Sequence, residues 1–159
     1  MIWGFRVSFG FPTAPRYQLD VLIRPETPDD YPVIRNVNLA AFGSRVEATL
    51  VERLRDDKLV IASLLAVDDA GHAVGHILFS PVTIMTSTTD DVEVASLAPM
   101  SVVPLHQRKE IGSMLIKHGV EACRGAHYRA IVFGWPSELL STFRFLARPR
   151  RRTEEPICY

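Results

Sequence analysis

Cysteine is scarce in this chain of 159 residues, which has only Cys123 and Cys158. Two cysteines cannot build a disulfide framework, and they lack the paired spacing of a zinc site. We therefore expect a reduced, cytoplasmic protein without a metal centre.

The chain also lacks an excess of charge of either sign, because 18 lysines and arginines balance 18 aspartates and glutamates. A neutral chain has no electrostatic footprint for nucleic acid or for an acidic membrane. The basic run RPRRR at 148–152 is a local exception, which we interpret as part of an irregular, solvated tail over 147–159, with weak contact to nucleic acid or phosphate as the alternative. Charge therefore predicts no nucleic-acid partner.

Long apolar runs are missing as well. The stretch MIWGFRVSFGFPTAP at 1–15 is interrupted by Arg6, by glycines and by two prolines before it reaches the length of a signal peptide or a membrane span. We interpret residues 1–19 as an N-terminal extension, either a poorly ordered leader or an added packing strand. We expect no association with a membrane.

What the chain does have is enough apolar residues, 47% of the total, to bury the core of one domain. Apolar periodicity predicts an α/β fold of the α+β type, a mixed sheet packed by helices. The predicted strands are 21–24, 61–69, 73–84, 92–104 and 129–134, and the predicted helices are 28–42, 46–54, 111–125 and 136–145.

Two local signals refine this order. Thr27, Pro28 and Asp30 have the spacing of a capped helix start. Pro99 lies inside the predicted strand 92–104, and a proline cannot donate a hydrogen bond to a neighbouring strand. Pro99 therefore predicts a bulge or a split strand, and a splayed strand leaves a gap that can admit a ligand.

The segment SVVPLHQRKEIGSMLIKHG at 101–119 predicts a strand, a basic turn and an amphipathic helix. The start of a helix offers unpaired N–H groups and a positive dipole end, which favour an anion such as phosphate. Gln107, Arg108 and Lys109 add donors or charge, and Gly112 removes a Cβ from the path of a ligand. The predicted ligand is a pyrophosphate group, although an ordinary surface helix can also begin with basic residues and a glycine.

The whole pattern resembles the GNAT superfamily of N-acetyltransferases, whose acyl-CoA signature is Q/R-x-x-G-x-G/A after a strand ending in V-x-P. The residues at the corresponding positions here are Val102, Val103, Pro104, Gln107, Glu110, Ile111, Gly112 and Ser113. The segments IRPETPDD, VGHILFSPV, LAPMSVVP and FGWPSELLSTFRF extend the resemblance over about residues 21–146.

This resemblance implies a GNAT-like fold over residues 20–146, with splayed fourth and fifth strands that hold the pantetheine arm of CoA. It implies an enzyme that transfers an acetyl group from acetyl-CoA to an amine of a small molecule or a protein. The implied cofactor-binding residues are Val102, Val103, Gln107, Arg108, Lys109, Glu110, Ile111, Gly112 and Ser113. An incompletely paired sheet end would also permit a homodimer.

The sequence departs from the family pattern at three places. Glu110 replaces the first glycine of the signature, where a carboxylate and a side chain are both unfavourable. Leu139 and Leu140 stand where many relatives carry a tyrosine that protonates the leaving thiolate. After Phe145 the chain shows no further strand pattern, which predicts a truncated or altered C-terminus. An acyl-CoA-binding or partner-binding module with little activity is therefore the alternative.

The general acid and base are not identified by the sequence. Glu93 on the predicted strand 92–104 could act as a base through water, or it could be an ordinary surface carboxylate. His76 is more consistent with a packed histidine than with a catalytic one, whereas His106 beside the basic turn could contact either CoA or solvent.

Overall fold

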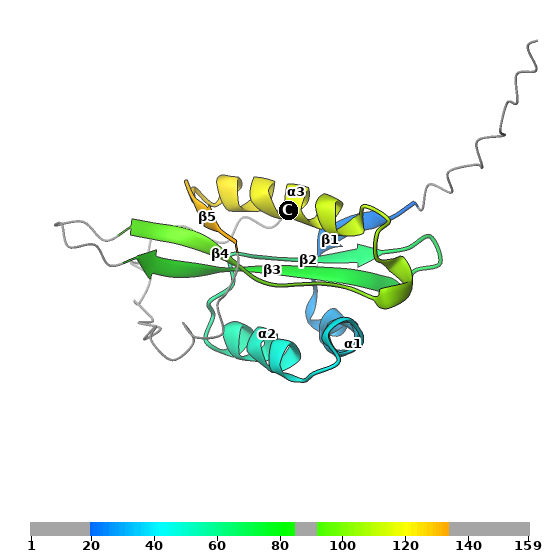
Figure 1. Ribbon diagram of the computed structural model, residues 1–159. Helices are drawn as coiled ribbons and strands as arrows, with labels where there is room; N and C mark the ends of the chain where they lie inside the picture. Colours follow the sequence, from blue (N-terminus) through cyan, green and yellow to red (C-terminus); the bar gives the residue numbers. More distant parts are fainter. Residues whose placement is uncertain (1–19, 85–91, 134–159) are drawn as a thin grey trace, which may run out of the picture.

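The computed structural model of the chain describes residues 20–84 and 92–133, which form one five-stranded sheet with helices on both faces (Figure 1). Helix α3 (Ile111–Gly125) covers one face, and helices α1 (Tyr31–Phe42) and α2 (Val46–Asp56) cover the other. The predicted mixed α/β architecture is confirmed. Over these residues, no helix combines the length and the apolar character needed to cross a membrane.

The strands follow one another across the sheet in sequence order, from β1 to β5. The first three pairings are antiparallel, and the last, between β4 and β5, is parallel. The strands are β1 (Leu22–Pro25), β2 (Ala62–Val67), β3 (Ala73–Ile84), β4 (Val92–Val102) and β5 (Ile131–Val132), and the short 3₁₀ turns are η1 (Pro28–Asp30) and η2 (Pro104–His106).

Most predicted elements lie within a few residues of their observed positions, with two limits. The strand predicted at 129–134 is found only at Ile131–Val132. The helix predicted at 136–145 and the tail 147–159 lie outside the described residues, as does the extension 1–19. The division of the chain into an extension, a domain and a tail therefore stays a prediction.

The predicted helix start at Thr27 is present, but it opens with the 3₁₀ turn η1 before α1 begins at Tyr31. The Thr27 N–H donates to Asp30 Oδ2 over 2.7 Å. The Arg24 guanidinium donates to both Asp30 carboxylate oxygens, at 2.7 and 2.8 Å, and holds the pKa of Asp30 well below its usual range. This charged pair ties strand β1 to the start of α1.

The sheet buries one apolar cluster on each face. The cluster under α3 includes Leu64, Ala66, Ile77, Phe79, Ala95, Ile111, Leu115 and Cys123, and the cluster under α1 and α2 includes Ile34, Val51, Leu54, Leu65 and Leu78. Cys123 is completely buried, and burial raises the pKa of its thiol to about 11.

Helix α3 approaches the sheet closely because Gly119 faces the buried Phe79 ring. A Cβ at residue 119 would lie 2.2 Å from Phe79 Cε2 and 2.8 Å from Phe79 Cζ. Neither distance is compatible with van der Waals contact. Glycine at this position therefore sets the distance between α3 and strand β3.

Polar side chains connect α2 to the sheet on the opposite face. Glu26 follows β1 and forms an ion pair with Arg55 of α2, whose guanidinium stacks over the Tyr31 ring at 4.1 Å. His76 of β3, which has no exposed surface, has its Nε2 atom 2.9 Å from Ser63 Oγ and 3.6 Å from Glu26 Oε2. His76 is thus a packed histidine, in agreement with the sequence-based interpretation.

The protonation state of this cluster follows from its geometry. His76 Nδ1 lies 3.5 Å from Asn38 Nδ2, and its Nε2 faces Ser63 Oγ and the Glu26 carboxylate. Burial lowers the pKa of His76 and keeps the ring neutral. Burial alone would raise the pKa of Glu26, but hydrogen bonds with His76, Arg55 and Ser63 outweigh it and lower that pKa to about 2.

We expect Gly119→Ala to lower the free energy of unfolding by about 2 kcal/mol, because the buried Phe79 ring has no space into which to move. Urea unfolding followed by circular dichroism measures the change. Gly125→Ala on the same helix is the matched control, since a Cβ there meets nothing within 4 Å. Equal stability of the two variants would contradict the close approach of α3.

We expect the stability of the fold to depend on the ionised Glu26 carboxylate. Its pKa is about 2 in the folded chain and near 4.5 in an unfolded one, so its contribution is complete above pH 4.5 and is lost as the pH falls toward 2. That contribution is on the order of 3 kcal/mol.

Urea unfolding at several pH values between about 6 and 2 tests this dependence. The free energy of unfolding should fall less steeply with decreasing pH in Glu26→Gln than in the wild type. In Asp56→Asn, which alters an exposed carboxylate of α2, its dependence on pH should equal that of the wild type. Parallel pH profiles for Glu26→Gln and the wild type would show that Glu26 contributes nothing.

Candidate functional site

The site begins at an irregularity in strand β4. Ile77 of β3 pairs with Met100, whereas Phe79 pairs with Leu97, so that Ala98 and Pro99 together face the single residue between the two. This arrangement is a β-bulge, as the position of Pro99 predicts. A bulge bends its strand, and here it separates the half of β4 that meets β5 from the half that does not.

Beyond the bulge, β4 keeps its pairing with β3 but, among the described residues, has an open edge on the other side. In the part of the chain that the structure describes, β5 pairs only with Ala95 and Ser96. The Val103 N–H donates to Val74 O over 3.0 Å, which makes Gly75 and Val102 a pair without hydrogen bonds between them. The backbone groups of Met100 and Val102 consequently point away from β3, toward the open edge.

The turn after β4 contains two residues in the left-handed region. Arg108 has φ 61° and Glu110 has φ 66°. Gln107 Nε2 donates to Val102 O over 3.0 Å and so fixes the turn to the end of β4. The conformation that we expected to favour glycine is therefore present at Glu110, at a cost of about 1–2 kcal/mol for a residue with a Cβ.

Helix α3 begins directly after this turn. The Met114 N–H donates to Glu110 O over 3.0 Å, and the amides of Ile111, Gly112 and Ser113 precede it in the first turn of the helix. The first amides of a helix have no partner within it, and they lie at the positive end of its dipole. The open edge of β4 thus leads to a group of backbone donors.

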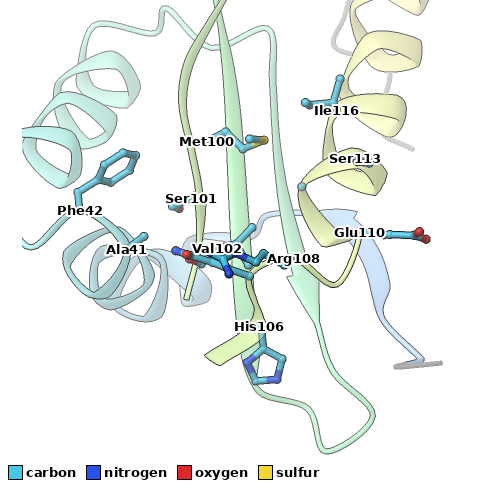
Figure 2. Close-up of a pocket in the computed structure, with 12 residues that line it drawn as sticks. Ala41, Phe42, Met100, Ser101, Val102, His106, Arg108, Glu110, Ser113 and Ile116 are labelled. Carbon is cyan, nitrogen blue, oxygen red and sulfur yellow. The ribbon is translucent and has the colours of Figure 1, made fainter. Parts of the chain in front are cut away.

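A pocket of about 410 Å³ joins these two features (Figure 2). It straddles the end of β4, with the end of α1 on one side and the first turns of α3 on the other. Its lining residues are Ala41, Phe42, Met100, Ser101, Val102, His106, Gln107, Arg108, Glu110, Gly112, Ser113 and Ile116. One part of the wall is apolar, and the part formed by the turn and the helix start is polar.

The pocket contains six of the nine residues that the sequence predicted for cofactor binding: Val102, Gln107, Arg108, Glu110, Gly112 and Ser113. Ile111 is only 1% exposed and packs in the core. Val103 donates to Val74 and accepts from the His106 N–H, so its backbone groups are already engaged. Lys109 is exposed and does not line the pocket.

The sequence missed five lining residues, which are Ala41, Phe42, Met100, Ser101 and Ile116. Met100 and Ile116 could have been found, because alternation along β4 and helical spacing from Gly112 place them beside predicted residues. Ala41 and Phe42 carry no such signal, since they lie about 60 residues earlier in the chain.

Glu110 lines the pocket without pointing into it. Figure 2 shows its carboxylate directed away from Met100 and Ser101. The side chain is exposed, so water screens its charge. Glu110 therefore affects the site mainly through its left-handed backbone conformation and not through its charge.

Two candidate side chains of the sequence analysis are now placed. His106 lines the pocket, and its Nδ1 atom is buried without a hydrogen-bond partner among the described residues. Glu93 is exposed on β4 opposite Thr83, seven residues before Met100 and therefore roughly 20 Å from it along the strand. The structure brings His106 to the pocket and does not bring Glu93 there.

Comparisons with known proteins agree with this geometry. A model of the acetyltransferase (GNAT) family matches residues 23–138. The uncharacterized N-acetyltransferase YhbS of Escherichia coli K12 is 32% identical over 125 residues, which cover 79% of this chain and 73% of YhbS. The chain belongs to the GNAT acetyltransferase family. It is accordingly an acyltransferase.

Solved structures of GNAT enzymes resemble the fold as a whole. A GNAT acetyltransferase from Brucella melitensis, in complex with acetyl-CoA, is 36% identical with a TM-score of 0.64, and the match covers 77% of this chain and 80% of that one. Escherichia coli YhbS in complex with CoA is 31% identical with a TM-score of 0.67, and the match covers 79% and 68% of the two chains.

We expect Glu110→Gly to raise the free energy of unfolding by about 0.5–1 kcal/mol. Glycine removes the left-handed cost, and its greater freedom in the unfolded chain offsets only part of that gain. Lys109→Gly is the control, because Lys109 does not have a positive φ and should gain nothing. A lower stability of Glu110→Gly in urea unfolding would contradict this account of the turn.

Proposed function

We propose that this GNAT enzyme transfers the acetyl group of acetyl-CoA to an amine of a small molecule or a protein. The observation that carries the proposal is the pocket that joins the open edge of β4 to the unpaired amides of α3. Acetyl-CoA has the matching parts, a pyrophosphate and an arm with two amide groups. The bound acetyl-CoA of the Brucella melitensis relative and the bound CoA of YhbS support this assignment.

The residues present fit the pyrophosphate. The amides of Ile111, Gly112 and Ser113 would donate to its oxygens, and Arg108, which lines the same pocket, would add a positive charge. The first side-chain atom that a substitution at Gly112 would add meets only Met100, at 3.6 Å, and a larger side chain would extend into the pocket. Gly112 thus leaves room for phosphate close to the backbone.

The open edge of β4 fits the pantetheine arm. Backbone groups of Met100 and Val102 point toward the open edge and can pair with the amides of the arm as with a neighbouring strand. Gln107 Nε2 already donates to Val102 O, which has a second lone pair for another donor. The thioester would then lie toward the bulge, where β4 and β5 part.

The reaction is acyl transfer. The free amine of the acceptor attacks the acetyl carbonyl, the new C–N bond forms, the C–S bond breaks, and the proton lost by nitrogen balances the one gained by the thiolate. The general base stays unassigned, because Glu93 does not line the pocket. Leu139 and Leu140, which stand where the family would place the acid, lie outside the described residues. The acceptor, a homodimer and the cytoplasmic location also stay proposals.

Calorimetric titration of acetyl-CoA into the purified chain tests the proposal. We expect micromolar binding by the wild type and a loss of at least about 100-fold in Gly112→Trp, whose indole would fill the space left beside Met100. Gly125→Trp is the control, because a side chain there extends from the end of α3 into open space. Its affinity should equal that of the wild type.

The assay of transfer follows release of free thiol with a panel of amines. Thiol release that depends on an amine supports the transferase. Binding without any transfer would instead favour the alternative, an acyl-CoA-binding module, and no binding by a folded wild-type chain would overturn the assignment of the pocket.

A further inference from the structure

Phe42 is a large apolar side chain that stays partly exposed at the pocket. It is the last residue of α1, and 43% of its surface is exposed although it lines the pocket. Helix α1 ends at once after it, because Gly43 has φ 68° and its N–H donates to Leu39 O over 2.9 Å. The position of Phe42 at the pocket is therefore fixed by a regular helix end.

On its side of the pocket, the Phe42 ring is the larger of two apolar lining side chains. On the α3 side, Met100 and Ile116 are half-buried and form an apolar wall (Figure 2). On the α1 side, the apolar lining residues are Ala41 and Phe42. Figure 2 shows Phe42 and Ile116 on opposite sides of β4. A ligand on the open edge of the strand would thus lie between the Phe42 ring and Ile116.

The apolar character of Phe42 indicates which part of the ligand it contacts. Phe42 has no hydrogen-bonding group and cannot bind phosphate, whose donors lie on the turn and on α3. The pantetheine arm carries two methyl groups on one carbon and several methylenes, and these gain free energy when they leave water. An aromatic ring offers a large apolar area at little cost in side-chain entropy.

We infer that Phe42 covers the pantetheine arm of acetyl-CoA from the α1 side and so makes helix α1 part of the cofactor site. The inference rests on the proposed function, since it needs acetyl-CoA in the pocket. It assigns to α1 a role in holding the cosubstrate. The alternative role of the ring, contact with the acceptor amine, is an outcome that the test separates.

The test compares two ligands that share the phosphates and differ in the arm, acetyl-CoA and 3′-phospho-ADP. Phe42→Ala should weaken acetyl-CoA about tenfold in calorimetric titration, because roughly half the ring area is available for burial. The affinity for 3′-phospho-ADP should stay within about twofold. Phe42→Leu should recover most of the loss, since it keeps an apolar side chain.

Val46→Ala is the matched control. Val46 begins α2 and is 64% exposed, but it does not line the pocket, so both affinities should stay at the wild-type values. Because both side chains lie at the surface, circular dichroism should show the same fold for each variant.

Three results would overturn the inference. The first is an unchanged affinity of Phe42→Ala for acetyl-CoA, and the second is an equal loss for both ligands. The third is an unchanged affinity for acetyl-CoA with a raised KM for the acceptor, which would place the ring at the acceptor. Failure of the wild type to bind acetyl-CoA is a different result, and it would overturn the proposed function itself.

Discussion

The pairing of β4 is the constraint on which the site depends. The strand is hydrogen-bonded to β3 along almost its whole length, yet among the described residues it meets β5 only at Ala95 and Ser96. The bulge at Pro99, which lies between the residues paired with β5 and the open end of β4, shifts the register by one residue. A strand held firmly on one side and free on the other presents ordered backbone donors and acceptors, which is what an extended ligand needs.

Packing on both faces of the sheet holds this edge in place. On one face, Gly119 lets α3 lie close to Phe79, and Gly75 leaves room for the Leu115 side chain, whose Cδ1 would lie 3.0 Å from an added Cβ. These contacts fix where α3 starts, and therefore where its unpaired amides lie. On the other face, the ion pair between Glu26 and Arg55 fixes α2 to the sheet. The pocket lies between two layers that are anchored independently.

Local signals in the sequence predicted the elements that depend on local physics. The spacing of Thr27, Pro28 and Asp30 marked the start of the first helix, and Pro99 marked the bulge, because each acts through its own backbone. The turn and the helix start at 107–113 were found from residue types alone. The family resemblance supplied the splayed fourth and fifth strands, which periodicity does not contain.

Contacts between distant segments were beyond such signals. Nothing near Phe42 indicates that the end of α1 meets the end of β4, and nothing near His76 indicates Glu26, Ser63 and Asn38 as its neighbours. Val103 and Ile111 were predicted as ligand contacts because they lie in the segment 102–113, which resembles the family signature. Their engaged backbone and buried side chain follow from strand register and helix phase, which only the assembled sheet determines.

The departure of Glu110 from the family signature has a limited effect on the proposed ligand site. The proposed contacts with phosphate and with the pantetheine arm use mainly backbone groups, and backbone groups persist when side chains change. Glu110 keeps the left-handed conformation that the turn needs and directs its carboxylate away from Met100 and Ser101. Its cost therefore falls mainly on the stability of the turn. Side chains that meet the ligand directly, with Phe42 first among them, are where this chain can differ from other members of its family.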